Sequence, residues 1–185
     1  MKENIKKVRL SKLETYILYF FIYSFLGWCF ETLYAVYELG HFTKRGFLFG
    51  PMCPIYGYGA LILLIFLRRY KKNSLKLFCI SAIVLSAFEY LVSFGLEGLF
   101  KSHWWDYTNE FFNLNGRISI LFTFVWGIAA ILFINHIHPF VKKHLNKHLF
   151  KKIHVSMQSN IVKILFCICV IDTISSCIIH TKFPI

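Results

Sequence analysis

Four carboxylic acids stand inside long apolar stretches of this chain: Glu31, Glu89, Glu97 and Asp172. A carboxylate surrounded by hydrocarbon is unfavourable unless it is paired, protonated or in contact with water. Such groups therefore commonly mark pathways for substrates, ions or protons. The alternative is that they only hydrogen-bond between helices and hold a bundle together. Because several carboxylates exceed what that structural role requires, the pattern favours a polar cavity that binds a ligand.

Charged and amide side chains in two predicted loops could bind a polar ligand beside these carboxylates. Arg45 lies in the first loop, and Asp106, Asn115 and Arg117 lie in the second. An arginine pairs well with a carboxylate, so we expect the two arginines to face the acidic residues. The tryptophans and tyrosine next to Asp106 are typical of an aromatic belt at a membrane surface, so simple anchoring of this loop is the alternative.

The segment from residue 45 to residue 59 combines glycines and prolines at the entrance of an apolar stretch. This composition predicts a break in regular helix, which is tolerated at membrane depth where the backbone is buried in protein or lines a wet cavity. Free amides and a helix N-terminus there could bind an anion or a carboxylate. An irregular turn without a ligand is the alternative. The residues that carry this prediction are Gly50, Pro51, Pro54 and Gly57.

No set of residues in the sequence matches a known catalytic or metal-binding motif. His144 and His148 have the spacing of two metal ligands on a helix, but no cysteine or carboxylate nearby completes a site. The nucleotide-binding P-loop and the zinc-protease and serine-hydrolase motifs are absent. We therefore predict no catalytic residue, no metal and no cofactor, and any ATP hydrolysis would need a partner subunit.

The composition is that of a polytopic membrane protein. Hydrophobic residues make up 57% of the 185 residues, charged residues only 16%, and the mean hydropathy is +0.56. A soluble domain carries about 25% charged residues. The apolar runs reach roughly twenty residues, enough to cross a bilayer, and the first is read as a helix and not as a cleaved signal peptide. We predict one all-α membrane domain over residues 1–185, with five transmembrane helices at about 16–37, 47–67, 75–99, 118–135 and 160–179.

The segment 139–158 predicts a separate basic amphipathic helix. Val141, Leu145, Leu149 and Ile153 recur every fourth residue with lysines and histidines between them. Such a helix typically lies on a membrane surface and contacts anionic lipid. We place it on the cytoplasmic leaflet, where a partner protein could also dock.

Basic residues are distributed unevenly among the loops. The net charge is +12, but it is concentrated between the apolar spans, which indicates membrane topology and argues against nucleic-acid binding. Sixteen of the 21 basic residues fall on one predicted side, which places the N-terminus in the cytoplasm and the C-terminus outside a cell membrane. Glu31, Glu89 and Glu97 then lie in the outer half, with Asp172 near the midplane. The five basic residues on the outer side are Lys44, Arg45, Lys101, Arg117 and Lys182.

Several short segments of the chain carry a resemblance to a known family. They are Gly27-Trp28 with Glu31, Arg45-Gly46-Phe47, Gly50-Pro51, Cys53-Pro54-Ile55-Tyr56-Gly57, Glu89-Tyr90, Trp105-Asp106-Tyr107 and Asn115-Gly116-Arg117. Together they resemble the bacterial membrane-protein family described as putative ABC-transporter type IV, or CmpB-like. The resemblance covers most of the chain and implies an integral membrane protein, a permease-like subunit.

We therefore expect a transport component with an outward-facing acidic cavity, which could work with an ATP-binding subunit. One alternative is a non-catalytic membrane sensor or assembly partner. The least favoured alternative is a membrane enzyme that acts on a lipid-linked or envelope substrate.

Overall fold

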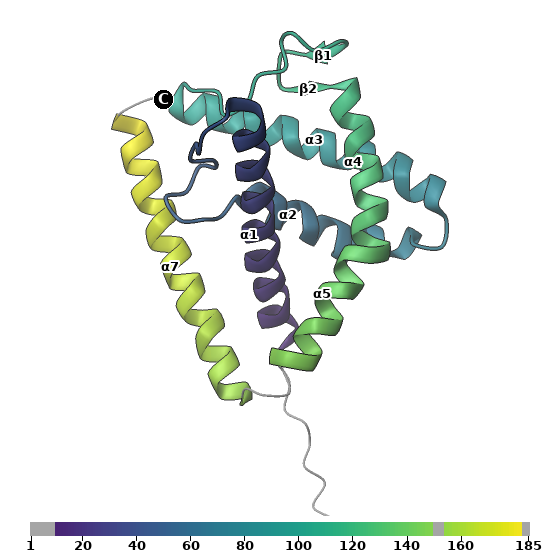
Figure 1. The fold of residues 1–185 in the computed structure, drawn as a ribbon, viewed down its shortest axis with the longest axis vertical. Coiled ribbons are helices and arrows are strands. Elements are labelled where there is room, and N and C mark those ends of the chain that lie inside the picture. Colours follow the sequence, from purple (N-terminus) through teal and green to yellow (C-terminus); the bar gives the residue numbers. More distant parts are fainter. Residues whose placement is uncertain (1–9, 150–153, 183–185) are drawn as a thin grey trace, which may run out of the picture.

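The fold is mostly helical. A computed structural model of the chain describes residues 10–149 and 154–182. Outside these ranges lie four N-terminal basic residues of the topology count (Lys2, Lys6, Lys7 and Arg9) and residues 150–153 of the predicted amphipathic segment. The α-helices shown in Figure 1 are α1 (Lys12–Leu39), α2 (Pro54–Ile62), α3 (Ser74–Phe100), α4 (Ile120–Leu132), α5 (His138–His144) and α7 (Val155–Lys182).

In the part of the chain that the structure describes, four helices are long and apolar enough to cross a membrane, as expected for a multi-pass membrane protein. They span Lys12–Leu39, Ser74–Phe100, Ile120–Lys147 and Val155–Lys182. The predicted all-α class is confirmed, while the count of five transmembrane helices is not.

The second predicted span differs from its prediction because its first third is not helical. Residues 47–53 form a loop, and α2 begins only at Pro54, which occupies its first turn after an extended Cys53. The helix then continues through a π-helical turn at Leu63–Leu67 and a 3-10 turn at Arg68–Tyr70. A proline lacks an amide hydrogen and is best accommodated in the first turn, so the helix cannot extend upstream through Pro51 and Pro54.

The fourth predicted span and the amphipathic segment form one helical run instead of two separate helices. α4 continues through a π-helical segment at Phe133–Ile137 into α5, and then through a second one at Leu145–Leu149. Pro139 is the second residue of α5 and follows the first π segment by two positions. The wider π turn accommodates a residue without an amide donor, so the proline does not end the helix. After the gap, the residues from Val155 to Gln158 belong to α7.

A short hairpin precedes α4 where the sequence predicted helix from residue 118. Strand β1 (Asn113–Leu114) pairs antiparallel with β2 (Ile118–Ser119). Asn115 and Gly116 both have positive φ values, which Asn-Gly turns adopt readily. The Ser119 side chain then accepts a hydrogen bond from the Phe122 amide and caps α4.

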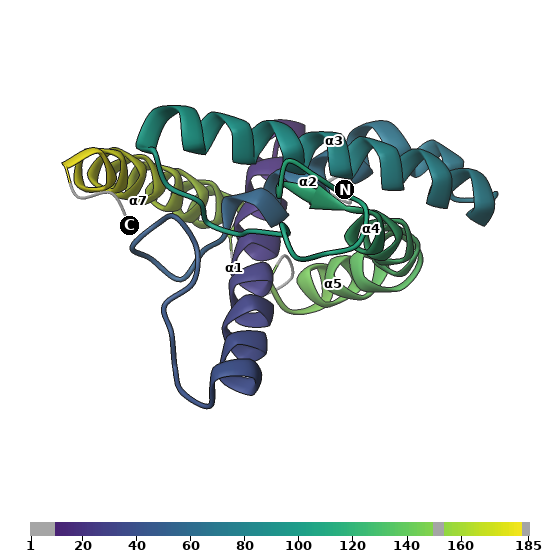
Figure 2. The same cartoon turned by 90° about the horizontal axis from the view of Figure 1, so that it is seen from above.

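Glycines allow the helices to pack closely in pairs. An added Cβ at Gly27 of α1 would lie 2.3 Å from the Tyr56 ring of α2, and one at Gly57 would lie 2.2 Å from the Ser24 hydroxyl. Gly127 of α4 likewise faces the Phe78 ring of α3 at 2.5 Å. Small residues at such contacts are typical of membrane helices, whose backbones approach closely. Helices α3 and α4 are not parallel: α3 runs across α4 and also across α1 (Figures 1 and 2).

Helix α7 lies beside this assembly and buries the smallest share of its residues among the four long helices. At its N-terminal end, the Ser159 hydroxyl donates a hydrogen bond to Glu14 of α1. At its C-terminal end, Asp172 and His180 contact the loop before α2. The apolar side chains between these ends are largely exposed.

Candidate functional site

Glu89 is a buried carboxylate near the middle of α3. The residue is 4% exposed, yet its two oxygens accept hydrogen bonds from Trp126 Nε1 at 2.7 Å and from the Tyr107 hydroxyl at 3.1 Å. Both donors are neutral, and none of the ion pairs among the described residues involves Glu89. A negative charge on Glu89 would therefore be stabilised by the dipoles of these donors and not by a cation.

Glu31 of α1 has a similar environment. It is partly buried and accepts a hydrogen bond from the hydroxyl of Tyr56, in the first turn of α2. The Tyr56 ring lies 6.1 Å from the ring of Trp126, the residue that donates to Glu89. We call Glu31, Tyr56, Glu89, Tyr107 and Trp126 the carboxylate cluster. It draws one residue from each of α1, α2, α3, α4 and the loop before the hairpin.

Tyr107 connects the two carboxylates electrostatically. Burial raises its pKa above the ordinary tyrosine value, and the charges of Glu89 and Glu31 raise it further because both disfavour a phenolate. The ring stacks on Phe122 with centroids 4.4 Å apart. Tyr107 therefore remains a fixed, protonated hydrogen-bond donor.

Glu97 and Arg117 form an ion pair near the C-terminal end of α3. His103 also approaches Glu97, with its Nε2 at 3.6 Å from a carboxylate oxygen. The Arg117 guanidinium lies over the Tyr90 ring, 5.4 Å from its centroid, and the Asn115 amide donates to the Tyr90 hydroxyl at 2.9 Å. A hollow of about 170 Å³ borders the ion pair. The positive charge of Arg117 is thus neutralised by Glu97 and not by the carboxylate cluster.

Two predicted site residues have other surroundings. Asp106 is exposed and accepts hydrogen bonds from the hydroxyl and the amide of Thr108, which lower its pKa. It therefore closes a turn beside the hairpin. The Nε of Arg45 is buried and has no hydrogen-bond partner among the described residues. Within residues 10–149 and 154–182, Arg45 forms no ion pair with a carboxylate.

Asp172 binds the irregular loop before α2. Its carboxylate accepts hydrogen bonds from the amides of Phe49 and Gly50, both at 2.9 Å, and from the Ser176 hydroxyl at 3.3 Å. The sequence predicted that free amides in this loop could bind a carboxylate, and here the carboxylate comes from the chain itself. A Cβ at Gly50 would lie 3.0 Å from Asp172, so the glycine also permits the close approach.

The predicted residues therefore divide into separate groups. Glu31 and Glu89 belong to the carboxylate cluster, while Glu97, Asn115 and Arg117 form a second group with Tyr90. Asp106 and Asp172 have other partners, and Arg45 forms no ion pair among the described residues. The hollow beside Glu97 and Arg117 includes no residue of the carboxylate cluster. Sequence reasoning missed Trp126. The signal was a single tryptophan in the interior of an apolar span, because its indole N–H requires a partner there.

The comparisons with known proteins agree with this membrane architecture. The family described as putative ABC-transporter type IV matches residues 18–177. None of the curated proteins and none of the solved structures compared with the chain matches it. The matched region contains nearly all of the helical structure and every candidate site residue. The chain therefore belongs to the putative ABC-transporter type IV family, as its sequence motifs predicted.

Proposed function

We propose that the protein is the membrane-embedded component of a transporter and that its carboxylate cluster binds a cationic substrate. The observation that carries this proposal is the environment of Glu89, a buried carboxylate that contacts only neutral donors and has a second carboxylate nearby. A purely structural acid in a membrane would normally face a cation or be replaced by a neutral amide.

The cluster has the chemistry that a cation requires. Glu31 and Glu89 supply negative charge, and the rings of Tyr56, Tyr107 and Trp126 supply π faces that attract cations in sites shielded from water. A bound cation would offset the mutual repulsion of the two carboxylates, which is unfavourable in a medium of low dielectric constant. This chemistry favours a monovalent cation with some apolar surface.

The remaining parts of the proposal concern the whole assembly. We place the protein as a single domain in the cell membrane, with its N-terminus in the cytoplasm and the carboxylate cluster facing outward in an acidic cavity. The basic loops and the end of the α4–α5 run would then face the cytoplasm, where an ATP-binding subunit could dock. The absence of a P-loop in the sequence is consistent with energy supplied by such a subunit.

The cation proposal is tested by equilibrium binding of tetraphenylphosphonium, a monovalent aromatic cation, to the full-length protein in lipid nanodiscs. We expect Glu89→Gln and Glu31→Gln each to weaken binding at least about tenfold, since each removes one unit of charge from a shielded site. Quenching of tryptophan fluorescence should accompany binding and disappear in Trp126→Phe.

Glu38→Gln is the matched control because it removes an exposed carboxylate from the same helix as Glu31. It should bind as the unmodified protein does. Equal affinity in the control and in both cluster variants would contradict a cation site. If, in addition, the protein co-purified with a stable partner that lacks an ATP-binding domain, a sensor or assembly role would replace transport.

A further inference from the structure

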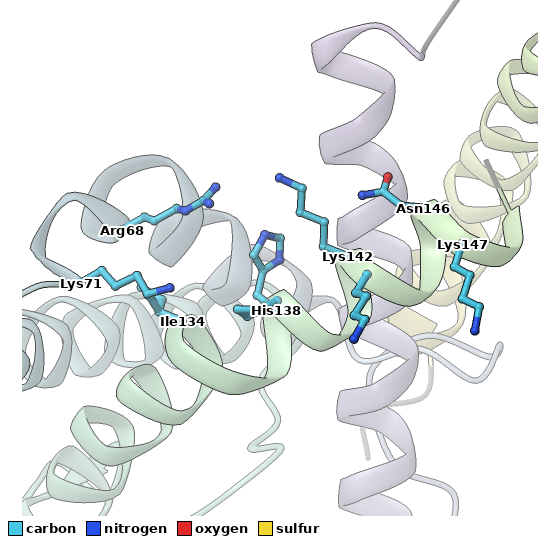
Figure 3. A pocket seen from close by; sticks show the side chains of 9 residues that line it. Arg68, Lys71, Ile134, His138, Lys142, Asn146 and Lys147 are labelled. Atoms are coloured by element: carbon cyan, nitrogen blue, oxygen red, sulfur yellow. The ribbon is translucent and has the colours of Figure 1, made fainter. Parts of the chain in front are cut away.

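A basic hollow lies away from the carboxylate cluster, between the turn that follows α2 and the α5 segment. Its volume is about 590 Å³. Figure 3 shows its side chains, which come from two parts of the chain separated by all of α3 and α4. Five cations line the hollow: Arg68, Lys71, Lys142, Lys143 and Lys147.

No acidic residue lines the hollow. Within residues 10–149 and 154–182, both ion pairs have Glu97 as the acidic member, with His103 and Arg117 as its partners. None of the five cations of the hollow therefore has a carboxylate partner. Five like charges around one space repel one another, and this repulsion is relieved when an anion enters. The electrostatics of the hollow therefore select a ligand that carries negative charge.

The side chain of His138 forms part of the wall of the hollow and is held in a fixed position. The residue is 3% exposed, and its Nδ1 shares a hydrogen bond of 2.8 Å with the Tyr23 hydroxyl of α1, which holds the ring in place. Arg68, from the 3-10 turn after α2, and Lys142, from α5, both extend toward the space above this ring (Figure 3). An arginine and lysines on opposite sides of one space match the geometry of a phosphate group, which accepts several charge-assisted hydrogen bonds.

Apolar residues adjoin the cations. Ile134 and Pro139 line the same hollow, and Arg68 directly follows the apolar turn Leu63–Leu67. The hollow thus lies where apolar helix gives way to basic residues, as at the boundary between hydrocarbon and headgroups in a membrane. A ligand with a phosphate and an attached apolar part would contact both kinds of residue.

We infer that this hollow is a binding site for a phosphate-bearing anion, with the headgroup of an anionic phospholipid as its source. The site is independent of the proposed cation site, because it uses different residues from different elements. The bound anion would neutralise the positive charges on the α5 segment and on the turn that follows α2. It would thereby fix the position of these two elements relative to each other.

Native mass spectrometry of the full-length protein tests this inference. Protein in detergent is mixed with phosphatidylglycerol, with phosphatidylcholine or with inorganic phosphate, and bound adducts are counted. The triple variant Arg68→Gln, Lys71→Gln, Lys142→Gln should bind phosphatidylglycerol at least about tenfold more weakly, since a basic residue near an anionic lipid contributes several-fold to affinity. The control triple, Arg69→Gln, Lys72→Gln, Lys163→Gln, removes the same charge outside the hollow and should keep its affinity.

The ligand arms distinguish the source of the phosphate. Binding of phosphatidylglycerol over phosphatidylcholine, reduced only in the first triple, supports a lipid site. Binding of inorganic phosphate without preference for the anionic lipid supports the phosphate site but assigns it to a soluble anion. An equal loss in both triple variants, or no loss in either, would overturn the inference, because binding would then follow net charge alone or involve other residues.

Discussion

Replacing Gly27 by alanine should lower the free energy of unfolding by about 1–3 kcal/mol, the usual cost of overpacking a close contact. An added Cβ would lie 2.3–2.5 Å from three atoms of Tyr56, including its own Cβ. These atoms are near the backbone and cannot rotate away, so α1 and α2 must separate. The Tyr56 hydroxyl then leaves Glu31, and the substitution disturbs the carboxylate cluster without changing any of its members.

The same substitution at Gly95 provides the control. Gly95 lies within α3, and an added Cβ there meets no atom within 4 Å. Alanine is the better helix former by about 0.5–1 kcal/mol, so Gly95→Ala should be neutral or stabilising. Unfolding of both variants in mixed micelles of increasing denaturing detergent measures the difference. Equal stability of the two variants would show that α1 and α2 do not approach as closely as described.

Asp172→Ala should destabilise the attachment of α7 by about 3 kcal/mol, because it removes two hydrogen bonds to a charged acceptor at about 1.5 kcal/mol each. A hydrogen bond to a charged group contributes about 1.5–3 kcal/mol, and the lower value applies here because Asp172 is only partly buried. The Phe49 and Gly50 amides would lose their partner, so their hydrogen exchange should accelerate strongly. Asp172→Asn keeps one acceptor oxygen and should have about half the effect.

Thr173→Val is the matched control for this experiment. It also removes a polar group from α7, but the Thr173 hydroxyl bonds only to the Cys169 carbonyl of its own helix at 2.7 Å. Exchange at Phe49 and Gly50 should stay slow in this variant. If Asp172→Ala left their exchange unchanged as well, the loop before α2 would be held by other contacts, such as the hydrogen bond between His180 and the Phe47 carbonyl.

Much of the helical architecture follows from local sequence. The third span carries a predicted polar face, made by Ser86, Glu89, Tyr90, Ser93 and Glu97, and the structure buries three of them, Ser86, Glu89 and Ser93. Pro51 and Pro54 predict an interruption before the second span, where the loop is found. These features depend on residues close together in the chain, and a period of 3.6 residues or a missing amide hydrogen is enough to predict them.

The pairing of side chains between helices could not be predicted in the same way. The partners of Glu89 are Tyr107 and Trp126, and no pattern along the chain relates these three residues. The contact between Trp126 and Glu89 depends on how closely α3 and α4 approach each other. Gly127 permits this close approach, because it leaves room for the Phe78 ring of α3. Arg45 and Arg117 were equally plausible partners for the carboxylates by sequence, and only the placement of the hairpin assigns Arg117 to Glu97.

Helix α7 contacts the rest of the protein at two places, through Ser159 and through Asp172, and most of the stretch between them is not covered by protein. Between the Ser159 contact and the Asp172 contact, the helix presents apolar side chains such as Ile164, Phe166 and Ile168 to its surroundings. In a bilayer, acyl chains are the solvent that packs against this stretch. Lipid molecules would then act as a structural layer beside α7, and the fit between acyl-chain length and the distance between the two attachments would set the tilt of the helix.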